Sequence, residues 1–218
     1  DQYTRRKIQV KVFPNSQLGL EQNTAKDVQL GTLDLTLVAI NNASIMALPK
    51  LLNNTASGNA GGDIIRITQG IVTAPISFGP ESLLHSAVHV TAQLQVALGQ
   101  LLTVRGGVNF KMAANVAVSC SGPIDLRGTA AAPIVFTSDK DDTISGDTNA
   151  DGAATQPAPG NWLQIHVATS AGASRLEHVL IRYASANSAL LQSAQCSARA
   201  LRVEHSIGDG IPPTDDAG

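Results

Sequence analysis

The first 50 residues combine strand-like and helix-like patterns of apolar positions. The stretches KIQVKVFP, residues 7–14, and LDLTLVAI, residues 33–40, alternate as strands do. Between them, residues 18–31 place Leu, Thr and Val near helical spacing and end on a glycine. We therefore expect a small α/β segment over residues 1–50, which is either a cap for the remainder of the chain or an incomplete domain.

The pattern changes after residue 50. Residues 52–62, LNNTASGNAGG, are rich in Gly, Asn and Ser and predict a linker over residues 51–63. Beyond it, short β-prone runs end at Gly, Asn, Ser or Pro with little helical periodicity between them. A sandwich and a solenoid both fit such runs, and recurring small residues at bends favour the solenoid. We expect a mainly β fold, a right-handed parallel β-helix over residues 64–211, followed by a tail over residues 212–218.

Composition limits how the core of such a solenoid is built. Aromatic residues make up only 3% of the chain, so the core must consist mostly of Val, Ile, Leu and Ala, which suits repeated packing. Trp162 is expected to be a core residue rather than a sugar platform. Four glycines are expected at cramped or left-handed corners: Gly106, Gly107, Gly122 and Gly128.

Charge and hydropathy exclude two classes of partner. The chain has 15 Lys+Arg against 17 Asp+Glu, a net charge of −2, and no basic stripe that would bind nucleic acid. It has no apolar run of roughly 18 residues, so we expect no membrane span. Cys120 and Cys196 lack metal-site spacing and can pair only if the fold brings them together.

Several stretches also resemble a known family. LLTVRGGVNFKM, PIDLRGTAAAPIVFTS and LEHVLIRYAS resemble successive coils of right-handed parallel β-helix proteins exported to bacterial surfaces. The resemblance covers about residues 64–211, and Leu163 departs from the glycine pair that this family usually has after the tryptophan. It implies a secreted, periplasmic or cell-surface protein.

The N-terminal segment resembles a different family. VFPNSQLGLEQNTAKDVQLGTLDLTLV resembles the periplasmic solute-binding proteins of TRAP-type dicarboxylate transporters, over about residues 6–37. Those proteins bind an organic acid between two α/β lobes through an arginine, but Arg5 and Arg6 lie outside the matched motif. Because the likeness stops, and the chain begins DQYTRRK without Met, we expect a fragment or a fusion.

The stretch SDKDDTISGDTNADG, residues 138–152, gathers five aspartates in one loop. Asp147, Asn149 and Asp151 precede a glycine in the pattern D-x-N-x-D-G, in which three oxygens can converge on one calcium ion. Asp139, Asp141 or Asp142 can supply further charge, because the twelfth position is an alanine instead of the EF-hand glutamate. We therefore predict a calcium site, with Asp139 or Asp142 assisting; the alternative is a solvated acidic loop.

Two other groups of residues are candidate sites. The dipeptides Glu177-His178 and Glu204-His205 are 27 residues apart, which predicts a ladder that either binds a transition metal or is merely solvated. Three late arginines, if they lay beside Asp147 and Asp151, would suit calcium-dependent cleavage of an acidic polysaccharide: Arg182, Arg199 and Arg202.

The sequence favours a non-catalytic, exported structural or adhesive module, calcium-stabilised, that binds a glycan or a cell-surface protein. It assigns no catalytic and no cofactor-binding residue. One alternative is a polysaccharide-degrading β-helix enzyme, a lyase or hydrolase. A second is a fragment of a periplasmic solute-binding protein for organic acids. The oligomeric state stays open.

Overall fold

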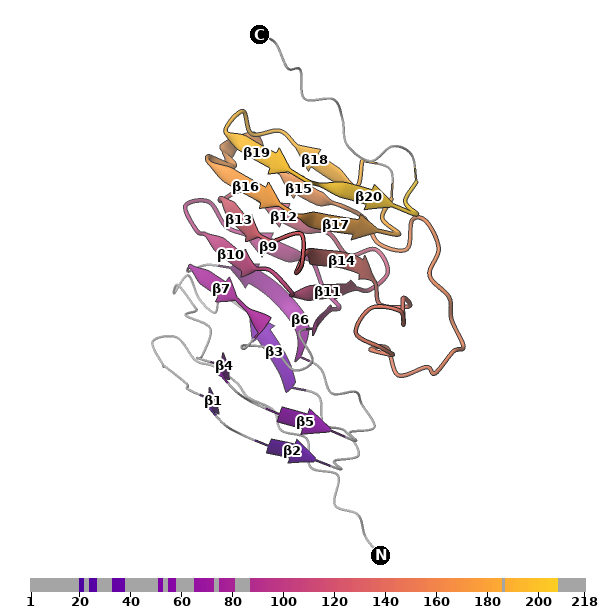
Figure 1. Cartoon of the computed structure of the whole chain (residues 1–218). Coiled ribbons are helices and arrows are strands. Elements are labelled where there is room, and N and C mark those ends of the chain that lie inside the picture. The colour runs from indigo at the N-terminus through magenta and orange to yellow at the C-terminus, as the bar shows by residue number, and fades with distance from the viewer. Residues whose placement is uncertain are drawn as a thin grey trace, which may run out of the picture.

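The computed structural model confirms a mainly β fold built as a parallel β-helix (Figure 1). Residues 65–72, 75–80, 87–185 and 187–207 are described, together with five strands nearer the N-terminus. These five are β1 (Leu20–Glu21), β2 (Thr24–Lys26), β3 (Leu33–Leu37), β4 (Leu51–Leu52) and β5 (Thr55–Ser57). Every strand pairing in the described residues is parallel, as a solenoid requires.

Three faces of strands run along the solenoid. The first face contains β8 (Ala87–Val90), β11 (Asn109–Met112), β14 (Ile134–Ser138), β17 (Val179–Arg182) and β20 (Arg202–Glu204). The second face contains β9 (Leu94–Val96), β12 (Val118–Cys120), β15 (Ile165–Val167) and β18 (Ala189–Leu191). The third face contains β7 (Ile76–Phe78), β10 (Leu102–Arg105), β13 (Ile124–Arg127), β16 (Ser174–Glu177) and β19 (Cys196–Arg199). One strand of each face therefore makes up each complete coil.

The strand β6 (Ile65–Val72) belongs to two faces at once. Its first residues, Ile65–Ile67, pair with β8, and its last, Gly70–Val72, pair with β9. The first and second faces therefore form one continuous sheet through β6, whereas β7 starts the separate third face. On its other edge, β6 pairs with β3.

Successive coils differ in length at one place. In the first-face register, Val88 lies beside Phe110 and Phe110 beside Phe136, which are steps of 22 and 26 residues. The next step, from Phe136 to Ile181, takes 45 residues. The excess is the acidic segment between β14 and β15, residues 139–164, which leaves the solenoid as a long loop (Figure 1).

Inward side chains stack from coil to coil. The rings of Phe110 and Phe136 lie in register with their centroids 4.6 Å apart and their planes 4° from parallel. Phe78 meets Phe110 edge-on at 6.0 Å, and Trp162 lies 6.4 Å from Phe136. Trp162 is fully buried and its Nε1 donates a hydrogen bond to the carbonyl oxygen of Arg182 at 2.7 Å. The prediction of Trp162 as a core residue is confirmed.

The glycines predicted at corners are confirmed. A Cβ on Gly128 would lie 2.4 Å from the carbonyl oxygen of His178 in the next coil, and one on Gly122 would lie 2.3 Å from the carbonyl oxygen of Gln100. Any side chain there would force neighbouring backbones apart. Gly106 is equally crowded, and Gly107 has a left-handed backbone with φ +87°.

Two local predictions for the N-terminal part are wrong. Strands β1 and β2 lie where the apolar spacing of residues 18–31 predicts a helix, while β3 confirms the strand predicted from residue 33. The stretch predicted as a linker, residues 51–63, contains β4 and β5, which pair with β1 and β2. In these strands, parallel pairing prevails over local spacing. The strand predicted at residues 7–14 and the tail at residues 212–218 lie outside the described residues.

The predicted Glu–His ladder is also wrong. Glu177 ends β16 on the third face and lies beside Arg199, whereas Glu204 ends β20 on the first face and lies beside Arg182. The two dipeptides are more than one coil apart along the chain, because regular coils here take 22 residues instead of 27. His205 instead stacks on Tyr183 with ring centroids 5.4 Å apart.

We expect Phe110→Ala to lower the free energy of unfolding by about 3–5 kcal/mol, because it removes the central ring of the aromatic stack and leaves a cavity. Chemical denaturation followed by circular dichroism measures the loss. Leu98→Ala, at a side chain that is 69% exposed, is the control and should change stability by less than about 0.5 kcal/mol. Equal losses in both variants would contradict the stacked core.

Candidate functional site

The acidic loop is held against the outer surface of the first face. It leaves β14 at Ser138 and re-enters the solenoid at β15. On the first face, side chains that point away from the core alternate with those that point into it. The outward residues His89, Lys111 and Thr137 lie side by side in three successive coils, so they form a polar column next to the start of the loop.

A cation does lie in the acidic loop, and it is a lysine of the chain itself. Lys111 on β11 has no exposed surface. Its Nζ donates hydrogen bonds to the backbone carbonyl oxygens of Asp141, of Ile144 at 2.8 Å and of Gly146 at 3.4 Å. The loop therefore curls around an ammonium group with three carbonyl oxygens directed at it.

Burial and charge act on Lys111 in opposite directions. Loss of hydration lowers the pKa of Lys111 below its usual value, while the negative charges of Asp141, Asp142, Asp139 and Asp147 raise it. The aspartates concentrated in this loop thus offset part of the cost of burying a charged amine.

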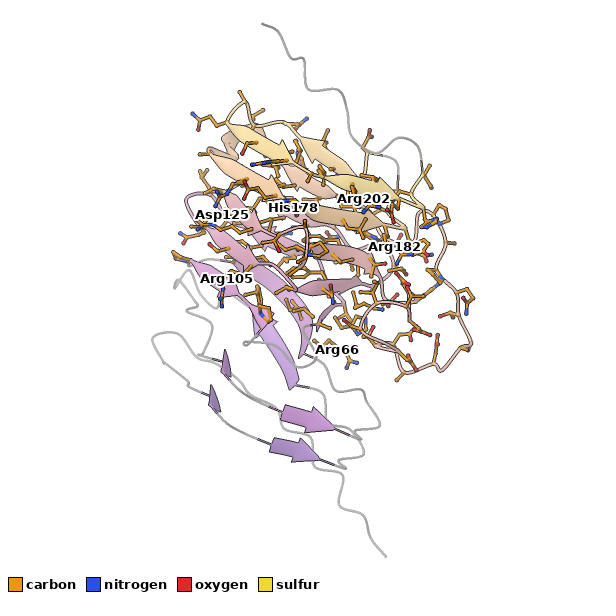
Figure 2. All side chains as sticks on the ribbon, viewed as in Figure 1. Arg66, Arg105, Asp125, His178, Arg182 and Arg202 are labelled. Atoms are coloured by element: carbon orange, nitrogen blue, oxygen red, sulfur yellow. The ribbon has the colours of Figure 1, made fainter. Side chains whose placement is uncertain are left out.

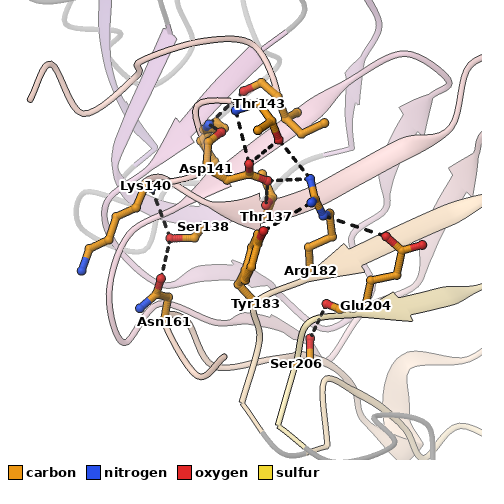
Figure 3. Close-up of polar contacts among 12 residues, drawn as sticks. Thr137, Ser138, Lys140, Asp141, Thr143, Asn161, Arg182, Tyr183, Glu204 and Ser206 are labelled. Atoms are coloured by element: carbon orange, nitrogen blue, oxygen red, sulfur yellow. Dashed lines mark hydrogen bonds and ion pairs between the residues drawn. The ribbon is translucent and has the colours of Figure 1, made fainter. Parts of the chain in front are cut away.

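Asp141 connects the loop to a second cation, Arg182. Its fully buried carboxylate accepts a hydrogen bond from Thr137 Oγ1 at 2.6 Å and one from Arg182 Nη1 at 2.8 Å (Figure 3). The hydroxyl of Thr143 donates to the same carboxylate. Arg182 lies on β17, one coil beyond β14, and its Nε is also 4.0 Å from the carboxylate of Glu204. The loop is thereby fixed to two coils by one buried ion pair.

Further contacts fasten the loop at several points. The side chain of Asn109 donates to Ser145 Oγ at 2.9 Å, and Ser138 Oγ lies 3.1 Å from Asn161 Oδ1 (Figure 3). His89 Nε2 lies 3.3 Å from the carboxylate of Asp139, and its buried Nδ1 has no hydrogen-bond partner. The start, the middle and the end of the excursion all contact the solenoid or one another.

The residues predicted to bind calcium are brought together in part. Asp147 accepts hydrogen bonds from the backbone N–H groups of Asp151 at 3.2 Å and Gly152 at 2.8 Å. The side-chain amide of Asn149 donates to the carboxylate of Asp151 at 2.9 Å. Asp139, by contrast, pairs with His89.

Asp142 lies in the electric field of these residues. Its pKa is raised by loss of hydration and by the negative charges of Asp147 and Asp151. Three buried oxygens in this region accept no hydrogen bond: Asp142 Oδ1, Asn149 Oδ1 and Asp151 Oδ1. Within the described residues, no three or more His, Cys, Asp or Glu side chains converge in a geometry that would hold a metal ion.

The three late arginines have separate partners and places. Arg182 is paired with Asp141, and Arg202 donates to Glu204 on the same strand. Arg199 lies on β19, on the third face. The hypothesis that the three converge beside Asp147 and Asp151 is therefore wrong, because the coils distribute them over two faces.

The two cysteines are free. Cys196 lies beside Ser174, one coil beyond Ile124, while Cys120 precedes Ile124 in the chain. Two coil steps of about 4.8 Å separate them, which exceeds the reach of a disulfide. Burial, and to a smaller extent Cys196, raise the pKa of Cys120 to about 12, so its thiol is not reactive at neutral pH.

Comparison with known proteins gives one match. A family model described as bacterial extracellular solute-binding protein, family 7, matches residues 1–52. This match includes the stretch that resembles TRAP-type receptors and ends with the last residue of β4. No curated protein and no solved structure matches the chain. The part of the chain that the structure describes contains no helix with the length and hydropathy needed to cross a membrane.

We expect Lys111→Met to loosen the acidic loop, because the carbonyl oxygens that face the ammonium lose their donor. Unpaired buried carbonyls cost on the order of 1–3 kcal/mol each. Hydrogen exchange should show faster exchange of amides between residues 139 and 152, with the solenoid strands less affected. Lys140→Met makes the same chemical change beside the site and should leave these amides unchanged. Protection in Lys111→Met equal to that of the unmodified protein would contradict the role of the ammonium.

Proposed function

We propose that the chain is an exported, non-catalytic β-helix module that presents a regular surface to a glycan or a cell-surface protein. The resemblance of residues 64–211 to exported β-helix proteins supports export. So does the match of residues 1–52 to a family described as extracellular. The parallel solenoid supports a role in display, because stacked coils build long, flat faces with evenly spaced side chains.

The observation that carries the proposal is the buried network of Lys111, Asp141 and Arg182. The acidic loop is the richest cluster of charged groups in the sequence, and it uses its central carboxylate and two cations to hold itself to the solenoid. A general acid or base must come within hydrogen-bonding reach of a substrate. Fully buried side chains that are already paired are suited to a structural role instead.

A polysaccharide-degrading enzyme is the alternative class. Glycan clefts commonly use aromatic rings as sugar platforms, but Phe78, Phe110, Phe136 and Trp162 are all buried in the core. Tyr183 stacks on His205 and lies 5.1 Å from the guanidinium of Arg182. The aromatic side chains of the described residues thus favour the core over a cleft. A solute-binding fragment, the other alternative, rests on a match to residues 1–52 alone.

The proposal predicts binding without turnover. Incubation with acidic and neutral polysaccharides should give no unsaturated product by ultraviolet absorbance and no new reducing ends, with and without calcium. A known lyase and a known hydrolase serve as positive controls. Steady release of product, lost in a variant of a loop aspartate, would overturn the proposal in favour of the enzyme.

We also propose that calcium binds the loop at Asp147, Asn149 and Asp151, with Asp142 as the assisting residue. Support comes from the three buried oxygens without a donor, since calcium takes oxygen ligands from carboxylates and side-chain amides. The raised pKa of Asp142 supports it further, because a bound cation would offset the repulsion that raises it. Asp139 is left out of the proposed ligand set because it faces His89.

Millimolar calcium should raise the melting temperature, by the equivalent of about 1–3 kcal/mol for a weak extracellular site. Asp147→Ala and Asp151→Ala should abolish this rise, whereas Asp125→Ala, in a strand of the third face, should retain it. Protons compete with calcium for Asp142, so the rise should shrink as the pH falls through its raised pKa. Identical melting with calcium and with chelator would leave only the solvated loop.

A further inference from the structure

The outer surface of the third face carries two parallel columns of side chains. Because alternate residues of a strand point outward, one column contains Ser77, Thr103, Asp125, Arg175 and Ser197. The second column ends the strands and contains Arg105, Arg127, Glu177 and Arg199. Neighbouring members of a column are separated by one coil, about 4.8 Å.

Positive charge is concentrated on this face. Its five strands carry four arginines against two carboxylates, a net charge of +2, in a chain whose net charge is −2. The remaining residues therefore carry −4. All four basic side chains are arginines, whose planar guanidinium matches a carboxylate in a two-pronged contact.

The arginines of this face already hold carboxylates. Asp125 accepts hydrogen bonds from Arg127 Nε at 2.7 Å and from Arg175 Nε at 3.0 Å, and Arg175 Nη1 is 3.8 Å from Glu177. Asp125 thus fixes the orientation of two guanidinium groups from adjacent coils. Their side chains are still 57% and 38% exposed, and a guanidinium has five N–H donors, so both can receive another acceptor.

We propose that the third face binds a linear polysaccharide that carries carboxylate groups. The proposal rests on the proposed glycan-binding function and names the class of glycan and the surface. A polymer fits because the positive groups repeat along the solenoid axis from Arg105 to Arg199, over three coil steps. The charge complements such a chain, and each guanidinium would form charge-assisted hydrogen bonds with a carboxylate.

The face is less suited to nucleic acid. Single strands bind chiefly through aromatic side chains that stack on the bases, and the two outward columns contain no aromatic residue among the strands described. A net charge of +2 also falls short of the basic surfaces that neutralise a phosphate backbone. Figure 2 shows Arg105 and Asp125 on this side of the solenoid, away from Arg182 and the acidic loop.

Affinity electrophoresis in gels that contain polygalacturonate tests the proposal, with fully methyl-esterified polymer as the uncharged control. The unmodified protein should be retarded by the acidic polymer alone, and increasing salt should release it. The double variant Arg127→Gln, Arg199→Gln should bind about tenfold more weakly. Arg202→Gln removes the same kind of side chain, 71% exposed, from the first face and should stay within about twofold of the unmodified protein. Melting temperatures establish that each variant is folded.

Each outcome bears on the proposal. Equal retardation by the esterified polymer, equal losses in the double variant and in Arg202→Gln, or no retardation at low salt would overturn it. Stronger competition by single-stranded DNA than by polygalacturonate oligomers would assign the face to nucleic acid and overturn it too. Cleavage of the bound polymer would refute the non-catalytic function while leaving the binding surface intact. Absence of both binding and cleavage would refute the surface alone.

Discussion

The structure depends on register between successive coils. In a parallel ladder each residue lies beside one residue of the previous coil and one of the next, so a side chain that is acceptable in the core must be acceptable at every step. Phe110 beside Phe136 shows the favourable result, two rings stacked within one column. Gly128 beneath the backbone of His178 shows the restriction, because the corner leaves no room for a Cβ. A chain with few aromatic residues meets this requirement with Val, Ile and Leu in most columns.

Register also explains how the acidic loop can be inserted without disturbing the coils on either side. The loop leaves at Ser138 and returns so that β15 still lies beside β12 and β17 beside β14. Closing a longer loop adds only a slowly growing entropic cost. That cost is offset locally, because Lys111 and Arg182 from two different coils hold the same turn at Asp141. The loop is therefore a fixed attachment of the solenoid.

The sequence predicts features that repeat and misses those that depend on distant pairing. Short β-prone runs and small bend residues were sufficient to predict the parallel β-helix, its glycine corners and the burial of Trp162. The partner of the acidic loop was not predictable, because Lys111 lies 30 residues before Asp141 and meets it only after the coils stack. The only signal was an outward lysine in a run that is otherwise typical of core. The same dependence on stacking separated Glu177 from Glu204.

The shared strand β6 has a mechanical consequence. At that end of the solenoid, one unbroken strand passes from the first face to the second, so the angle between the two faces is set by continuous backbone. In later coils the same two faces are joined by connections of growing length, residues 91–93, 113–117 and 139–164. Resistance to twisting between these faces should therefore be greatest at β6 and should fall towards the coil that carries the long excursion, which makes the solenoid a tapered spring rather than a uniform rod.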